Sequence, residues 1–427
     1  MNIKNSILAA ALALGLTGAA SAQNVTYIAG STAFRSAANA ALTNYCGTHS
    51  GGLIAYDNAT ATKAGHLLLN YVSGGVTNYI VATWNGSEAG IQSCAGPANG
   101  QSNAATFTFY ATNATAGLNT TYAVTHTATL DFSDTYQGTS VFNGNLRLAN
   151  SNTVNYAPLT EASASPVGVV AFTFIGSKNI PTNAQVTTEN INQLAASGNV
   201  PLTLFTGNSA DQTNSAFFIG RNIDSGTRLS MLAEVGYGVR TTLSSYAVAS
   251  GYTGGAASNT TATLTGVGTN ALISYPTEII NGVSTANPGN SGYSSGGTLC
   301  GFFTNAYSFG TNLSVNGSAS ARTGTNFLVG YAGVSDASGN VANGLVYLPY
   351  NGQSYSTNAI AQGLYTFWAY EHLYISANAT VADNSLAQAL ATAINNSTTA
   401  TLSPNVSIND MQCGRNGDGQ TVYSYYP

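Results

Sequence analysis

Charged side chains are scarce in this chain. Lys, Arg, Asp and Glu make up 6% of its 427 residues, with 10 basic against 15 acidic side chains, whereas an ordinary soluble domain carries about 25%. The few, scattered bases exclude the positive stripe that nucleic-acid binding requires. The hydrophobic fraction of 44% is too high for a disordered chain. Neutral polar side chains must therefore keep the folded protein in solution.

Long hydrophobic runs are also lacking, except for a short one near the beginning. The run Ile7–Leu16 is too short to span a bilayer. It follows Lys4 and precedes Ala20-Ser21-Ala22, a small-residue cleavage site. This pattern predicts that residues 1–22 are a removable secretion signal. No cysteine follows the cut, so we expect no lipid anchor, no membrane insertion after signal removal, and a periplasmic or extracellular protein.

Cysteine and histidine are too few and too scattered for a metal site. No two of the four cysteines form a C-x-x-C pair, which argues against zinc and thioredoxin chemistry. The four histidines show no ligand spacing, so we expect no metal and no cofactor. In an exported chain an even cysteine count predicts two disulfides. Of the three possible connectivities we expect Cys46–Cys94 with Cys300–Cys413.

Strand–turn–helix units recur along the chain, which predicts an α/β fold. The predicted strands are 25–29, 79–83, 167–176, 215–220 and 345–349. The predicted helices are 33–45, a short one from 89, 187–197, 226–236, an aromatic one over 360–374, and 381–395. Alternating Thr and apolar residues predict a β insertion over 106–131. The Gly/Ser/Asn/Thr-rich stretch 241–342 predicts either strands with long loops or a second insertion.

Four of these units carry a hydroxyl-bearing turn at the end of a strand. The turns are Gly30-Ser31-Thr32, Gly86-Ser87, Ser133-Asp134 and the loop from Arg221 to Ser225-Gly226-Thr227. A helix N-terminus presents unpaired N–H groups with a partial positive charge, and Gly lets the backbone approach a ligand closely. One such turn is more typical of a plain N-cap. Together with an arginine, the set predicts a cage for a small oxyanion.

The four turns resemble those of the phosphate-binding proteins of ABC phosphate importers, in the type II periplasmic binding protein superfamily. That family's Gly-x-Thr turn is matched by Gly30-Ser31-Thr32, and its Gly-Ser-x-x-Gly turn by Gly86–Gly90. Its Ser-Asp turn is matched by Ser133-Asp134. Its most specific motif, Arg-x-x-x-Ser-Gly-Thr, is matched by 221–227. The chain departs from the family at Ile223, where an acid that braces the arginine is common.

The resemblance implies a fold, a ligand and a set of ligand contacts. The fold is a two-lobed type II (Venus flytrap) fold with β-rich insertions, in which residues 23–165 and 346–427 form lobe I and residues 166–345 form lobe II. Inorganic phosphate is the ligand, bound between the lobes and presented to an ABC permease, without a chemical step. The implied ligand contacts are Thr32, Ala33, Ser87, Asp134, Arg221, Ser225, Gly226 and Thr227.

The implied chemistry is consistent with these residue types. Hydroxyls and backbone amides donate to phosphate oxygens, and Arg221 offers a planar, charge-assisted fork. Asp134 beside an anion is useful because hydrogen phosphate still has a proton to donate. Sulfate has none and would leave that carboxylate unpaired, a mismatch that can discriminate by about 10⁴–10⁵.

Other interpretations of the same residues stay open. Arg221 is alternatively an ordinary ion-pair residue, and Asp134 a turn cap. Glu88 is most simply a carboxylate at a helix start, and Arg35 a solvated side chain. For the whole protein, the alternatives are a secreted surface or matrix protein that retains the binding fold, or a binder of another oxyanion or of a phosphorylated small molecule.

Overall fold

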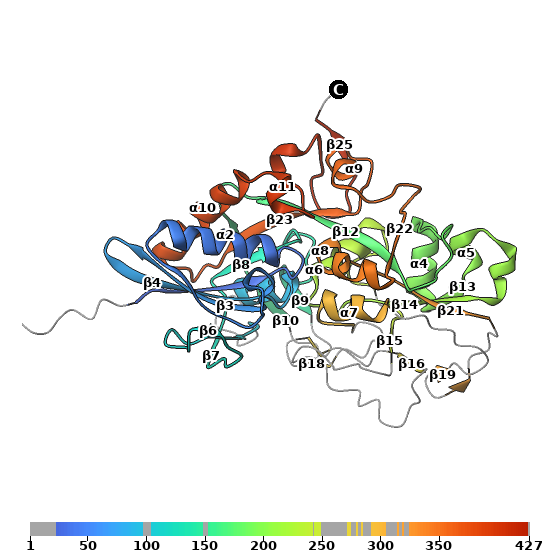
Figure 1. The fold of residues 1–427 in the computed structure, drawn as a ribbon, viewed down its shortest axis with the longest axis horizontal. Helices are drawn as coiled ribbons and strands as arrows, with labels where there is room; N and C mark the ends of the chain where they lie inside the picture. The colour runs from blue at the N-terminus through green and yellow to red at the C-terminus, as the bar shows by residue number, and fades with distance from the viewer. Residues whose placement is uncertain are drawn as a thin grey trace, which may run out of the picture.

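The computed structural model contains one large mixed sheet with helices on both faces, which confirms the predicted α/β class (Figure 1). The structure describes residues 23–96, 104–147, 153–241, 243–248, 271–274, 279–280, 283–284, 292–304, 314–315, 318–319 and 324–425. The expected secretion signal, residues 1–22, lies outside the described residues. Among the described residues no helix is long and apolar enough to cross a membrane.

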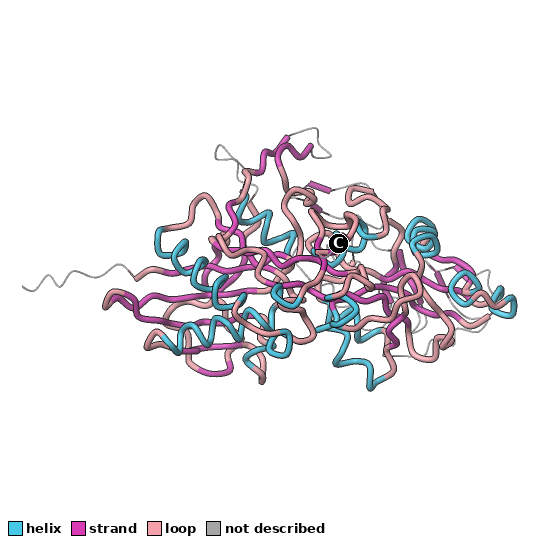
Figure 2. The backbone as a smooth tube through the Cα atoms, turned by 90° about the horizontal axis from the view of Figure 1, so that it is seen from above, coloured by secondary structure: helices cyan, strands magenta, loops and turns pink. Residues whose placement is uncertain are grey.

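The central sheet has 13 strands and runs along the length of the molecule (Figure 2). Its strands are β1 (Val25–Gly30), β2 (Gly52–Tyr56), β3 (His66–Ser73), β4 (Val76–Thr83), β6 (Gly117–Leu118), β8 (Leu130–Ser133), β11 (Thr160–Glu161), β12 (Gly168–Gly176), β13 (Asn199–Pro201), β14 (Ser215–Ile219), β21 (Asn326–Gly333), β22 (Val346–Leu348) and β23 (Trp368–Ile375). Along the main path their order is β13-β14-β21-β12-β23-β8-β1-β4-β3-β2-β6. The antiparallel strands β12 and β23 therefore join the two ends of the sheet.

Shorter strands pair outside this sheet. They are β5 (Phe107–Phe109) with β7 (Val124–His126), β9 (Gly144–Arg147) with β10 (Thr153–Tyr156), β24 (Cys413–Gly414) with β25 (Tyr423–Ser424), β17 (Ile279–Ile280) with β18 (Val283–Ser284), and β15 (Tyr246–Val248) with β16 (Ala271–Ser274), β19 (Ser314–Val315) and β20 (Ser318–Ala319). The β5–β7 hairpin confirms the β insertion predicted before Asp131.

Helices cover both faces of the sheet. They are α2 (Arg35–Thr48), α3 (Ser87–Ala95), α4 (Thr188–Ser197), α5 (Thr203–Thr206), α6 (Gly226–Glu234), α7 (Gly296–Phe302), α8 (Val334–Ala337), α9 (Thr357–Ala361), α10 (Val381–Asn395) and α11 (Thr399–Leu402). Residues that follow one another in a strand enter different cores: Ile28 packs with α2 and α10, whereas Ala29 packs with α3 and the β5–β7 hairpin. This alternation has the period of two that a strand requires.

The predicted aromatic helix over 360–374 is wrong. The helix α9 ends at Ala361, and Gly363 has a φ of +75°, which favours glycine and ends a helix. The chain then forms β23, whose first half pairs with β12 and whose second half pairs with β8. Aromatic side chains favour a strand packed on both sides, and this strand crosses the centre of the sheet.

The two expected disulfides are also wrong, because all four cysteines are buried free thiols. Cys94 packs in the core beneath α3, and Cys300 packs in the core beneath α7. Cys46 and Cys413 belong to the core on the opposite face of the sheet. Neither expected pair shares a core, so each thiol is a small apolar filler. Burial raises the pKa of Cys46 to about 12, which keeps that thiol protonated.

Candidate anion-binding site

Three of the four predicted turns lie at one edge of the sheet. The strand β1 pairs in parallel with β4 on one side and with β8 on the other. Parallel strands place their carboxyl ends together, which is where ligands bind in open α/β sheets. The turns are joined by backbone hydrogen bonds, from the Gly86 amide to the Gly30 carbonyl (3.0 Å) and from the Ser31 amide to the Phe132 carbonyl (2.7 Å).

Asp134 lies at the centre of these turns. Its carboxylate accepts a hydrogen bond from the Ser87 hydroxyl (2.5 Å) and another from the Ser31 hydroxyl (3.2 Å). Its amide donates to the Ser87 hydroxyl oxygen (3.1 Å). Asp134 is 1% exposed. The first three turns therefore share one buried carboxylate, which the sequence places in only one of them.

The fourth turn packs directly on this carboxylate. It begins after β14, which is parallel to β21 at the other end of the sheet. A Cβ placed on Gly226 would lie 1.7 Å from an Asp134 carboxylate oxygen and 2.8 Å from the Ser87 Cβ, so only glycine fits there. The Asp224 carbonyl accepts hydrogen bonds from the amides of Glu88 (3.1 Å) and Ala89 (3.3 Å). Segments from opposite ends of the sheet thus meet at Asp134.

Arg221 is buried and held by backbone carbonyls. Its Nε donates to the Tyr293 carbonyl (3.0 Å) and its Nη2 to the Ser294 carbonyl (2.9 Å). The Tyr331 hydroxyl accepts from its backbone amide (3.1 Å). Its Nη1 is buried without a hydrogen-bond partner within the described part of the chain. Only part of the expected guanidinium fork is therefore free for a ligand.

All the predicted site residues are buried, at between 1% and 7% exposure for those with polar side chains. The structure brings Ser87, Asp134 and Gly226 into direct contact. Ser225 caps its own helix, since its hydroxyl accepts from the Arg228 amide, and Thr227 lies in the first turn of that helix. The Ala33 carbonyl accepts from Ser335, and Thr32 precedes Ala33 in the same buried turn.

Three groups at this site are not among the residues predicted from the sequence. Ser31, next to the predicted Thr32, is the hydroxyl that binds Asp134. The carbonyls of Tyr293 and Ser294 hold Arg221 in place of the acid that is absent at Ile223. Ser31 could have been found, because it lies inside the quoted turn. The carbonyls could not, because any residue type supplies them and they lie far along the chain.

Burial dominates the electrostatics of the site. It raises the pKa of Asp134 to about 6, partly offset by the hydrogen bonds from Ser87 and Ser31 and by the charge of Arg221. It raises the pKa of Glu88 to about 8, although Thr135 and Ser140 both donate to that carboxylate. Glu88 lies in the first turn of α3, as the sequence predicts, but it is buried. At neutral pH Asp134 is mainly ionised and Glu88 mainly protonated.

Two further acids lie under the turns. The carboxylates of Asp131 on β8 and Glu371 on β23 are fully buried and have no hydrogen-bond partner within the described residues. Burial raises the pKa of both well above ordinary values. A fold with raised acid pKa values binds more protons than the unfolded chain, so its stability falls as pH rises.

We therefore expect the free energy of unfolding to fall as the pH rises from 5 to 8. The raised pKa of Glu88 alone gives a fall of at least about 2 kcal/mol, because one pKa unit corresponds to about 1.4 kcal/mol. Urea unfolding at a series of pH values measures this slope. The window follows from Glu88, whose pKa rises from 4.5 to about 8 on folding. The variant Glu88→Gln should show a shallower slope over this range. Equal slopes for the two proteins, or higher stability at pH 8, would contradict this assignment.

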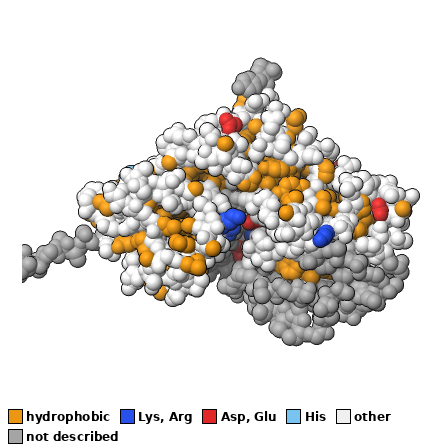
Figure 3. Space-filling model, viewed as in Figure 1, with side chains coloured by type: hydrophobic (Ala, Val, Ile, Leu, Met, Phe, Trp, Pro, Cys, Tyr) orange, Lys and Arg blue, Asp and Glu red, His pale blue; other side chains and the backbone are white. Residues whose placement is uncertain are grey.

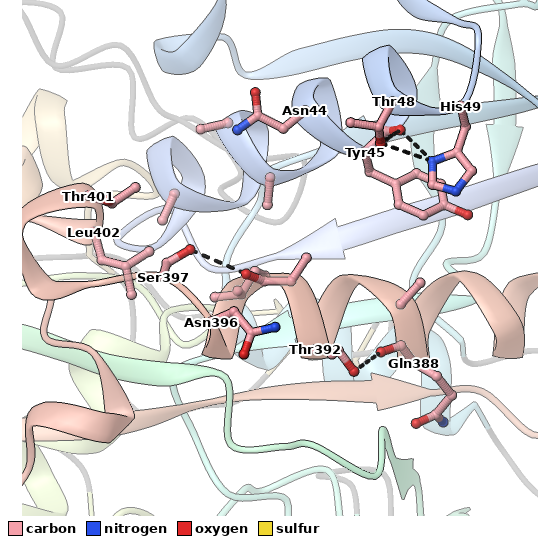
Figure 4. Close-up of a pocket in the computed structure, with 16 residues that line it drawn as sticks. Asn44, Tyr45, Thr48, His49, Gln388, Thr392, Asn396, Ser397, Thr401 and Leu402 are labelled. Atoms are coloured by element: carbon pink, nitrogen blue, oxygen red, sulfur yellow. Dashed lines mark hydrogen bonds between the residues drawn. The ribbon is translucent and has the colours of Figure 1, made fainter.

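The surface adds two observations. Figure 3 shows a small group of basic and acidic side chains in a hollow near the middle of one face, which otherwise carries few charges. A groove of about 750 Å³ lies elsewhere, between α2 and α10 (Figure 4). Its lining has no Lys, Arg, Asp or Glu, so it lacks a charge to recognise an anion.

The described residues contain no group of three or more His, Cys, Asp or Glu that could hold a metal ion.

Comparison with known proteins finds similarity only at low identity. No protein-family description and no curated protein matches the chain. Similar solved structures include PstS from Borrelia burgdorferi (12% identity, 90% of this chain, 99% of that one, TM-score 0.36). A second is a putative phosphate ABC transporter substrate-binding protein with bound phosphate from Clostridium perfringens (11% identity, 90% of this chain, 100% of that one, TM-score 0.41). A third is an ABC-type phosphate transport receptor from Vibrio cholerae (9% identity, 88% of this chain, 96% of that one, TM-score 0.39).

Proposed function

We propose that this protein is an exported solute-binding protein that captures inorganic phosphate and presents it to an ABC importer. The ligand would lie between a lobe of residues 23–165 with 346–427 and a lobe of residues 166–345. The observation that supports this most is the packing of Gly226 against Asp134 and Ser87. It brings four turns with the residue types of an oxyanion cage to one place, from opposite ends of the sheet.

The proposed chemistry assigns each residue a role. The buried Nη1 of Arg221 would donate a charge-assisted hydrogen bond to phosphate. The hydroxyls of Thr32 and Thr227, and backbone amides of the turns at Thr32, Ser87 and Thr227, would donate others. Hydrogen bonds to a charged partner contribute about 1.5–3 kcal/mol each. Several together support micromolar or tighter binding, about −8 kcal/mol. The ionised Asp134 would accept a hydrogen bond from the protonated oxygen of hydrogen phosphate.

Titration calorimetry with phosphate and with sulfate tests this function. We expect the wild-type protein to release heat with phosphate and not with sulfate near neutral pH. The variant Asp134→Asn keeps the shape of the side chain but offers donors, so it should lose most of its discrimination against sulfate. The exposed Glu189→Gln is a matched control that should leave both titrations unchanged. The variant Arg221→Ala should bind phosphate at least about 10-fold more weakly, since one charge-assisted hydrogen bond is lost.

A second candidate function has one observation in its favour. Several donors of the turns are already engaged within the protein, as Ser87 and Ser31 are with Asp134, and Arg221 with two carbonyls. A secreted surface or matrix protein that retains the fold would need no more than this. Such a protein would give no heat with either anion. Heat with sulfate, or only with a phosphorylated compound, would instead indicate a different anionic ligand.

A further inference from the structure

Two arginines approach one buried carboxylate beside the proposed site. The carboxylate of Asp336, on α8, lies 3.8 Å from Nη2 of Arg35, with side-chain exposures of 5% and 24%. A Cβ placed on Gly296 would lie 2.0 Å from the other Asp336 oxygen and 3.2 Å from Nη1 of Arg221. Arg35 and Arg221 therefore flank Asp336, the first nearer to solvent and the second fully inside.

The backbone explains why Arg35 lies here. The segment from β21 into α8 packs on the predicted Thr32 turn, because the Ser335 hydroxyl donates to the Ala33 carbonyl (2.8 Å). A Cβ on Gly333 would lie 2.8 Å from that of Ala33, so the two backbones are in close contact. Helix α2 begins two residues later with Arg35. The first turn thus brings a cation to the site as well as a hydroxyl.

Each arginine keeps a donor that no group in the described part of the chain accepts from. Nε of Arg35 and Nη1 of Arg221 are both buried, and neither has a hydrogen-bond partner within the described ranges. A buried donor left unpaired costs about 1–3 kcal/mol, and such a group calls for an explanation. The carboxylates of Asp336 and Asp134 offset the two guanidinium charges, but they leave these two donors unpaired. The oxygens of a bound oxyanion would supply acceptors for both donors.

We propose that Arg35 is a second ligand-binding arginine, and that a tetrahedral oxyanion is held between Arg35 and Arg221. This inference rests on the proposed function and deepens it, because it adds a residue to the binding site. A simple ion pair with Asp336 explains less. The separation of 3.8 Å is long, and the pair leaves the Arg35 Nε without a hydrogen-bond partner within the described residues.

Phosphate titration of three variants tests this role. Arg35→Ala should bind phosphate at least about 10-fold more weakly, because a charge-assisted hydrogen bond is lost. Arg35→Lys should recover part of the affinity, since it keeps the charge but not the planar fork. Arg240 is exposed, and Arg240→Ala should bind like wild type. Without phosphate, Arg35→Ala should melt at the wild-type temperature, which separates a binding role from a structural one.

The outcomes distinguish this inference from the proposed function. If Arg35→Ala binds phosphate like wild type while Arg221→Ala does not, the proposed function stands and the role of Arg35 is overturned. If Arg35→Ala melts at a clearly lower temperature and binds phosphate normally at low temperature, Arg35 is a structural ion-pair residue. If wild type gives no heat with phosphate, the proposed function and the inference both fail.

Discussion

Replacing Arg415 by Ala is expected to lower the free energy of unfolding by about 3–5 kcal/mol, the usual cost of removing one partner of a buried ion pair. Nη1 of Arg415 lies 3.0 Å from the Glu234 carboxylate, and the two side chains are 2% and 8% exposed. Nη2 donates to the Thr366 carbonyl. The guanidinium also lies 4.0 Å from the centre of the Trp368 ring, a cation–π contact.

Arg415 also lies where it connects elements of the candidate anion-binding site. Its partner Glu234 is the last residue of α6, the helix that begins with Gly226 and Thr227. Three residues further on, the Asp418 carboxylate accepts a hydrogen bond from the Tyr136 amide (2.9 Å), two residues after Asp134. The segment 415–418 therefore ties α6 to the loop that carries Asp134.

Urea unfolding of Arg415→Ala beside Arg240→Ala measures the effect. Arg240 is exposed, so its truncation should stay within about 0.5 kcal/mol of wild type. Similar unfolding midpoints for all three proteins would show that the ion pair with Glu234 contributes little, and that α6 is held in place by other contacts.

Replacing Gly226 by Ala is expected to abolish phosphate binding. The added methyl group would lie 1.7 Å from an Asp134 oxygen and 2.8 Å from the Ser87 Cβ. Both neighbours are buried and hydrogen-bonded to each other, so neither can move away without breaking the Ser87–Asp134 contact. The methyl group must push α6 away from the other three turns. We expect the affinity for phosphate to fall by at least about 100-fold, or about 2.7 kcal/mol.

The matched control for this substitution is Gly339→Ala. A Cβ on Gly339 would meet no atom within 4 Å, so the same chemical change should leave phosphate binding unaltered. Calorimetry on both variants, with circular dichroism to confirm that each is folded, makes the comparison. A folded Gly226→Ala variant that binds phosphate like wild type would mean that the ligand does not depend on the contact between α6 and Asp134.

Local patterns in the sequence predicted most of the elements. The strands ending at Gly30, Thr83 and Gly176 and the helices α2, α4 and α10 lie close to their predicted positions. In each case apolar spacing and a flanking Gly, Ser or Thr point to the same element. The helix predicted over 360–374 was wrong, because aromatic side chains at short spacing suit a buried strand as well as a helix. The two strands that pair with Trp368–Ile375 are distant in sequence.

The site was predictable only in part, for the same reason. Turn chemistry identifies Ser87, Asp134 and Gly226 without knowledge of the fold, and the structure brings them together. The groups that hold Arg221 are backbone carbonyls, which carry no sequence signal. The prediction of two disulfides was wrong, because the number of cysteines does not determine which core each thiol enters.

A crystal structure of the protein with bound phosphate tests the central claim most directly, that four turns from both ends of the sheet hold one tetrahedral anion. The account predicts phosphate within hydrogen-bond distance of Nη1 of Arg221 and of the turn at Gly226, close to the Asp134 carboxylate. Phosphate bound elsewhere, or no phosphate at concentrations far above micromolar with the turns ordered as described, would contradict it.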